Sequence, residues 1–76
     1  MKYYKYPKKK YIDPEYVNFT IYKVEYNIVI GIYNKFQGGG DDNGIWMEPN
    51  KNTIWTKEDL ILCDVLTEEE VFMEII

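Results

Sequence analysis

The strongest pattern in the chain is an alternation of apolar and polar residues over residues 17–33. Before Lys23 the apolar residues fall on odd positions, and after it they fall on even positions. A period of two indicates β-structure, and it cannot shift by one residue without an interruption. The interruption is either a β-bulge near Lys23 or a tight turn over residues 25–27 that forms a hairpin, and we favour the hairpin. Gly31 in the second run indicates a bend or a close backbone approach.

Three shorter patterns follow this region. Residues 45–48 and 53–56 each carry a tryptophan and are joined by a short Pro-Asn-Lys-Asn connection, so we expect a second hairpin. Residues 56–59 have the composition of a helix start and predict one helical turn. The apolar run 60–66 is compatible with either a strand or a helix.

The C-terminal residues 67–76 predict a short helix. Thr67 as N-cap and Glu70 three residues later form a capping box, and Leu66 and Val71 occupy the positions of a hydrophobic staple. The helix would be too short to survive without docking onto the rest of the chain. The apolar stripe expected to dock it consists of Val71, Phe72, Ile75 and Ile76. A final strand is the alternative, since Val, Phe and Ile also favour strands.

The first sixteen residues alternate tyrosine and lysine and are interrupted by Pro7 and Pro14. Tyrosine favours strands, whereas proline is excluded from central strands. Residues 1–16 are therefore predicted to be an extended arm or an edge strand.

Together these elements predict a single α+β domain over residues 1–76. It would contain a small, strongly curved antiparallel sheet of four to five strands, or an SH3-like partial barrel, with a short C-terminal helix. The possibility of an SH3-like partial barrel rests on residues 44–64. Their order of strand, tight turn, strand, short helical turn and strand resembles the latter half of an SH3-like barrel, in pattern rather than in any diagnostic motif.

The composition excludes several kinds of enzyme. The chain has no Ala, Ser, Arg or His, so Ser-His-Asp and Cys-His triads and histidine metal sites are excluded. Cys63 is the only cysteine and can form neither an intrachain disulfide nor a zinc cluster, which fits a reducing compartment. In its apolar surroundings it is expected to be a small buried hydrophobe rather than a nucleophile. We expect no enzymatic activity and no cofactor.

Charge is distributed unevenly along the chain. Residues 1–38 hold seven lysines against three acids, a balance of +4, and residues 39–76 hold two lysines against ten acids, a balance of −8. An acidic surface of this kind would engage a protein partner with a basic surface. The candidate partner-binding residues are Asp41, Asp42, Trp46, Glu58, Asp59, Glu68 and Glu69. The alternative is that these acids form a solvated face and helix caps.

The N-terminal arm suggests a different partner, single-stranded nucleic acid, because lysines bind phosphates and tyrosines stack on bases. The candidate residues are Lys2, Tyr3, Tyr4, Lys5, Lys8, Lys9 and Lys10. The net charge of −4 and the absence of Arg make nucleic acid the less favoured partner. The alternative is a strand with one packed tyrosine face and solvated lysines.

The glycine-rich loop at residues 38–44 matches no phosphate-binding motif. A dinucleotide fingerprint would need glycine at position 43, and a P-loop would need Gly-Lys-Ser/Thr at its end. Asp41, Asp42 and Asn43 are oxygen donors, but their spacing is not that of an EF-hand. We expect a connecting loop that holds no metal.

The sequence thus favours a non-enzymatic, small acidic protein that binds another protein as an inhibitor or accessory factor. Its size, acidity and residue usage are typical of phage and mobile-element proteins, including inhibitors of bacterial defence systems. Nucleic-acid binding and self-association as a homo-oligomer are the alternatives. The N-terminus lacks the apolar region of a signal peptide, and no apolar run is long enough to cross a membrane. We expect a soluble protein of the cytoplasm, in the host if it is phage-encoded.

Overall fold

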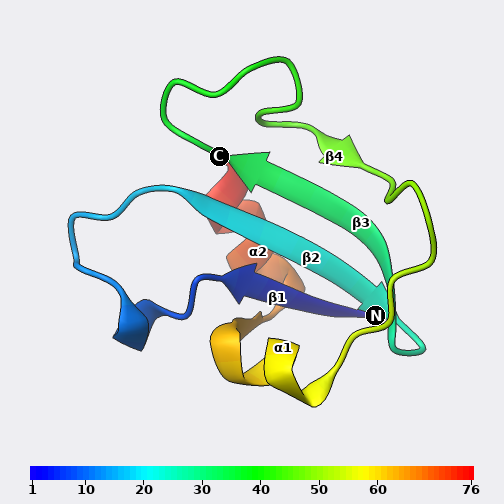
Figure 1. Cartoon of the computed structure of the whole chain (residues 1–76). Coiled ribbons are helices and arrows are strands. Elements are labelled where there is room, and N and C mark those ends of the chain that lie inside the picture. Colours follow the sequence, from blue (N-terminus) through cyan, green and yellow to red (C-terminus); the bar gives the residue numbers. More distant parts are fainter.

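A computed structural model describes residues 1–76 as an open antiparallel sheet with helices on its two sides (Figure 1). Five strands pair in the order β4-β3-β2-β1-β5. The elements in chain order are β1 (Lys2–Tyr6), the 3-10 helix η1 (Lys9–Tyr11), β2 (Phe19–Glu25), β3 (Ile28–Lys35), β4 (Trp46–Met47), α1 (Lys57–Leu62), β5 (Asp64–Leu66) and α2 (Glu68–Ile75).

The predicted antiparallel sheet with a short C-terminal helix is confirmed, and the sheet does not close into a barrel. Strands β4 and β5 form its two edges and do not pair with each other. The SH3-like arrangement is not confirmed, because the predicted hairpin of residues 45–48 with 53–56 is absent. β4 pairs with β3 instead. The segment before α1 bonds to the start of β3: the N–H of Val29 donates to the carbonyl of Thr53, and the N–H of Trp55 donates to the carbonyl of Asn27.

The hairpin β2–β3 contains both interruptions that the phase change allowed. Tyr26 and Asn27 form its two-residue turn with φ of 52° and 61°, the left-handed values that a tight hairpin requires. The register also shifts between Lys23 and Val24, which is a β-bulge. At Gly31 the predicted close approach is present, since an added Cβ would lie 3.3 Å from the Trp46 ring.

The position of β1 shows that the prediction for the N-terminal residues is wrong. It lies between β2 and β5, so residues 2–6 form an inner strand and not an extended arm or an edge strand. Pro7 follows the last residue of the strand and so interrupts none of its pairing. Tyr3 and Tyr4 are both buried, and each covers a different face of the sheet.

Both helices begin with a capping box. Thr56 and Asp59 form the first at α1, where the sequence predicts one helical turn. Thr67 and Glu70 form the second at α2, as the sequence predicts. The apolar run 60–66 divides at Cys63, with helix before it and strand after it. Because α2 begins at Glu68 after the Thr67 cap, the short helix predicted over residues 67–76 is confirmed, and the alternative of a final strand is wrong.

The apolar stripe predicted for α2 is only half right. Val71 is buried and Ile75 is partly buried against the same cluster, together with Leu66 of the expected staple. Phe72 and Ile76 are instead exposed to solvent. The reason is geometric, because residues three and four apart share one side of a helix whereas neighbouring residues do not.

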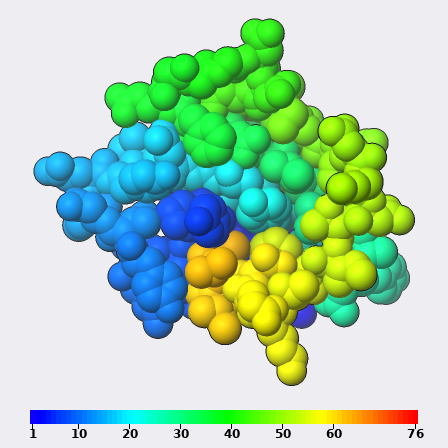
Figure 2. All heavy atoms as spheres, viewed as in Figure 1, coloured from blue at the N-terminus to red at the C-terminus, as the bar shows by residue number.

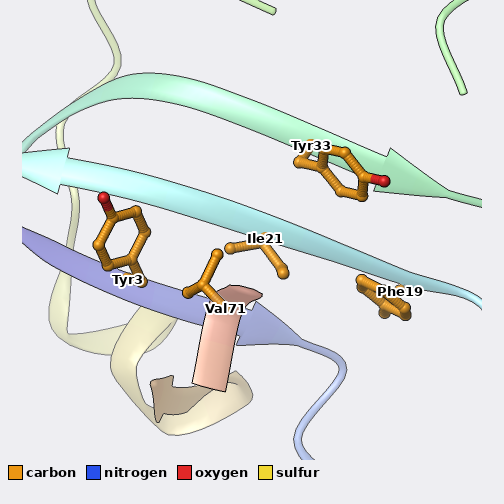
Figure 3. Packing of buried hydrophobic residues seen from close by; sticks show 5 residues of the cluster. All are labelled: Tyr3, Phe19, Ile21, Tyr33 and Val71. Atoms are coloured by element: carbon orange, nitrogen blue, oxygen red, sulfur yellow. The ribbon is translucent and has the colours of Figure 1, made fainter. Parts of the chain in front are cut away.

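Two apolar clusters stabilise the sheet, one on each face. The helix face, covered by α2, holds Tyr3, Phe19, Ile21, Tyr33 and Val71, and Figure 3 shows Val71 pointing from α2 toward Ile21. The Trp55 face holds Tyr4, Val24, Val29, Trp55 and Cys63. The one ion pair, between Lys5 Nζ and Glu74 Oε2 at 3.0 Å, ties β1 to α2. It is partly exposed and contributes at most about 1 kcal/mol.

Candidate functional site

The surface has a groove lined by three tyrosines. It has a volume of about 490 Å³ and lies where β1 ends and the chain turns back toward β2. Its lining consists of Tyr6, Pro7, Tyr11, Ile12, Tyr16 and Leu62. Figure 2 shows this side of the molecule, where the blue N-terminal segment adjoins the orange end of α1.

The groove has a simple structural origin. Pro7 ends β1, the helix η1 reverses the chain, and the N–H of Lys8 donates to the carbonyl of Leu62 at 2.8 Å, which ties this segment to α1. The tyrosines remain open to solvent, with exposed fractions of 44% for Tyr6, 57% for Tyr11 and 48% for Tyr16. The result is a concave, largely apolar surface with hydroxyl groups available for hydrogen bonds.

Three lysines lie on the chain segment that carries the tyrosines of the groove, although none of them lines it. Lys8, Lys9 and Lys10 form no ion pair, since the single ion pair of the protein joins Lys5 and Glu74. The ammonium of Lys10 lies 5.1 Å from the centre of the Tyr11 ring, which is a cation–π distance.

A smaller cavity of about 210 Å³ adjoins the groove on the Trp55 face. It is lined by Tyr6, Tyr22, Val29, Thr53, Trp55, Asp59, Leu62 and Cys63. Tyr6 and Leu62 line both the groove and the cavity, so they separate the two. The indole Nε1 of Trp55 is buried and has no hydrogen-bond partner, and burying such a donor costs on the order of 1–3 kcal/mol.

Burial and negative charge shape the electrostatics of this cavity. Burial raises the pKa of the Cys63 thiol to about 11, and the nearby carboxylates of Asp59 and Asp64 raise it further than Lys8 lowers it. Burial also raises the pKa of Tyr22, with smaller contributions from Cys63 and Asp59. The thiol is therefore protonated at neutral pH, which is the opposite of what activates a nucleophilic cysteine.

The chain matches no protein-family model, no curated protein and no solved structure. None of its helices has the length and apolar composition needed to cross a bilayer.

The structure divides the residues predicted to bind nucleic acid. Tyr3 and Tyr4 are buried in the two clusters, and Lys5 is paired with Glu74, so these three cannot form an open binding strip. Lys2 is exposed at the start of β1. Lys8, Lys9 and Lys10 lie on the segment that carries the tyrosines of the groove, but they do not line it. The exposed tyrosines at positions 6, 11 and 16 were missed as a group, although their alternation with lysine and proline was the available signal.

The residues predicted to bind a protein partner are spread over separate elements. Asp41 and Asp42 lie in the β3–β4 loop, Glu58 and Asp59 in the first turn of α1, and Glu68 and Glu69 in the first turn of α2. The two helices are associated with opposite faces of the sheet.

Two members of this set have structural contacts of their own. Asp59 Oδ2 accepts hydrogen bonds from the N–H and the hydroxyl of Thr56. Trp46 lies on the helix face, with its ring centre 5.5 Å from that of Tyr33, and it is partly open to solvent. Of the predicted residues, only Asp59 lines the cavity.

The glycine-rich loop is a connection from β3 to β4. Gly38 and Gly44 have φ of 73° and 81°, which glycine adopts without strain. The side chain of Asn43 accepts a hydrogen bond from the N–H of Phe36, and the N–H of Gly44 donates to the carbonyl of Asn34. No group of three or more metal-ligating side chains gathers here or elsewhere in the protein.

Proposed function

We propose that this protein is a non-enzymatic binding protein that engages a protein partner through the tyrosine groove. The observation that carries the proposal is the gathering of Tyr6, Tyr11 and Tyr16 on one open, concave surface. Tyrosine is enriched among the residues that dominate binding energy at protein interfaces, because it buries a large rigid surface and keeps a hydroxyl for hydrogen bonding.

The negative charge of this protein indicates which charge to expect on its partner. The net charge of −4 would attract a protein with a basic surface and speed the encounter, even though the acids are distributed over several elements. An inhibitor or accessory factor, such as those of phages and mobile elements, works in this manner by occupying a surface rather than by turning over a substrate. The single cysteine, which can form no disulfide within the chain, fits a partner in the cytoplasm.

The experiment compares capture of partner proteins by three forms of the chain. The double variant Tyr11→Ala/Tyr16→Ala should capture about tenfold less of a partner protein, or less still, than the unmodified chain does. The matched control is Tyr26→Asn, which removes a tyrosine that is 90% exposed at the β2–β3 turn and places there a residue that tolerates positive φ. Quantitative mass spectrometry gives the ratios, and circular dichroism verifies that each variant is folded. Equal capture by the double variant and the unmodified chain would refute the proposal.

A second candidate function is binding of single-stranded nucleic acid to the same groove. It is favoured by the unpaired lysines 8–10 beside exposed tyrosines, a combination that contacts phosphates and stacks on bases. In this case a labelled oligonucleotide should bind with an affinity that falls steeply with salt. Lys9→Gln/Lys10→Gln should weaken binding, whereas Lys35→Gln/Lys51→Gln, which removes equal charge from exposed positions elsewhere, should have a smaller effect.

Self-association is the remaining alternative from the sequence, and size-exclusion chromatography at micromolar concentration distinguishes it. A monomer elutes near 9.2 kDa, and elution well above that mass in the absence of any partner would favour a homo-oligomer.

A further inference from the structure

The cavity beside the groove is walled by aromatic rings from three parts of the chain. Tyr6 comes from the end of β1, Tyr22 from β2, and Trp55 from the segment before α1. The rings of Tyr22 and Trp55 lie 5.2 Å apart at 50° to each other, so they form two inclined walls. Tyr4 stacks on Trp55 at 4.6 Å without lining the cavity, which holds the indole in place from behind.

Asp59 is the only charged side chain that lines this cavity. Its Oδ2 accepts hydrogen bonds from the N–H and the hydroxyl of Thr56, at 2.8 and 2.9 Å, so the carboxylate is held in a fixed position. No hydrogen bond within the chain uses its Oδ1. The carboxylate acts on the cavity, since its charge contributes to the raised pKa values of Cys63 and Tyr22 in the walls. Lys8 lowers the pKa of Cys63, but it does not line the cavity.

The combination of aromatic walls and one carboxylate selects for a particular chemistry. The faces of tyrosine and tryptophan rings carry negative electrostatic potential and attract cations, most strongly cations that are weakly hydrated. Val29 and Leu62 add apolar surface that suits methyl groups, and Thr53 and Cys63 complete the lining. The volume of about 210 Å³ is smaller than a typical drug-sized site of about 300–1,000 Å³ and suits a single head group.

We propose that this cavity binds an alkylated ammonium group, delivered as the methylated lysine side chain of a protein that lies in the tyrosine groove. Delivery by a protein rests on the proposed function, because Tyr6 and Leu62 line both the groove and the cavity and so place the cavity directly beside a partner that lies in the groove. Recognition of the ammonium group rests only on the cavity. A free quaternary ammonium compound has the same head-group chemistry and therefore serves as the probe.

The first test titrates isotope-labelled protein with choline and follows the two indole N–H signals by NMR. Trp55 in the cavity wall should shift in a saturable manner, whereas Trp46 on the opposite face of the sheet should not. The neutral isostere dimethylbutanol has the same shape without the charge, and it should bind about tenfold more weakly or worse. Equal binding of choline and the isostere, or no saturable shift of Trp55 with choline, would overturn the proposal.

The second test uses a pair of neighbouring acids on α1. Asp59→Asn removes the charge in the cavity while its amide oxygen keeps an acceptor for the helix cap, and Glu58→Gln removes an equal charge from an exposed position outside the cavity. We expect the first to weaken choline binding about fivefold or more and the second to leave it within about twofold, since a fixed charge acts most strongly at short range. Equal effects of the two variants would show that general charge, rather than the cavity, attracts the cation.

The third test distinguishes the source of the ammonium group. Peptides with lysine, trimethyllysine or uncharged norleucine at one position are compared with free choline on the same indole signal. Tighter binding of the trimethyllysine peptide supports delivery by a protein partner, and tighter binding of choline overturns that part of the proposal. Because the choline titration needs no partner, it can succeed even if the capture experiment with the groove variants fails, and the reverse also holds.

Discussion

The two faces of the sheet are covered in different ways. On the helix face, α2 places Val71 over a cluster in which Ile21 has no exposed surface. On the Trp55 face, the cover is an irregular segment and α1, and α1 has no buried residue of its own. A regular helix with one apolar side fills the space above the sheet, whereas the irregular segment leaves a cavity and an unpaired indole N–H.

This difference separates stability from binding. The helix face has the features of a packed core, in which any loss of volume is felt by its neighbours. The Trp55 face has open walls, exposed tyrosines nearby and a fixed carboxylate, which are features of a surface that another molecule can complete. We therefore expect substitutions on the helix face to affect mainly folding, and substitutions around the cavity to affect binding as well as folding, because Val29, Trp55 and Cys63 are also buried.

The largest expected effect is on the helix face. Ile21→Ala should lower the free energy of unfolding by about 2–5 kcal/mol, because it leaves a void in a closely packed cluster. Val29→Ala on the Trp55 face should cost less, about 1.5 kcal/mol for two methyl groups, because Val29 already borders a cavity. Urea denaturation measures both. A cost for Val29→Ala equal to or above that of Ile21→Ala would remove the contrast between the faces.

The next effect is a loss of stability at high pH caused by Cys63. Its thiol has a pKa of about 11 in the folded protein, against an ordinary value of 9.0, so the folded state holds its proton more tightly than the unfolded state does. The resulting stability is complete below about pH 9 and is lost as the pH rises through about 11, a change on the order of 2 kcal/mol.

Thermal unfolding between pH 8 and 11 tests this expectation. The melting temperature of Cys63→Ala should fall less steeply with pH than that of the unmodified protein. The part of the fall that comes from the raised pKa of Tyr22 should remain in both proteins. Identical slopes for the two proteins would show that the thiol does not titrate differently in the folded state.

The smallest effect compares the two capping boxes. Thr67→Ala removes the cap of the packed helix α2 and should lower global stability by about 1 kcal/mol. Thr56→Ala removes the equivalent cap of α1, which has no buried residue. It should therefore increase hydrogen exchange within α1 and lower the global free energy of unfolding less than Thr67→Ala does. Native-state hydrogen exchange distinguishes the local from the global response. Equal global losses would mean that α1 is as strongly coupled to folding as α2.

Several features of the candidate site were not predictable because they depend on residues far apart in the sequence. The cavity joins Tyr6, Tyr22 and Trp55, and the groove joins the N-terminal segment to Leu62. Asp59 was identified from its charge, yet its place in an aromatic cavity follows from where α1 is held. The acidic residues that the sequence grouped together were brought to different parts of the molecule, because their elements lie on opposite faces of the sheet.

The sequence by itself determined the elements whose signals are local. The capping boxes at Thr56 and Thr67 each involve four consecutive residues, and the β2–β3 hairpin needs only an interrupted alternation and a turn that accepts positive φ. The signals of these features lie within a few neighbouring residues and can be recognised without knowledge of the fold, although the short helices need docking to be stable.

The tertiary structure alone decided where these elements lie relative to one another. β1 became an inner strand because β5, about sixty residues further along the chain, pairs with its free side. The segment 53–56 became the cover of a sheet face rather than half of a hairpin, since Trp55 is buried there against Tyr4 and Tyr22. Pairing and burial between distant residues depend on the folded arrangement of the whole chain, and no local pattern of apolar and polar residues records it.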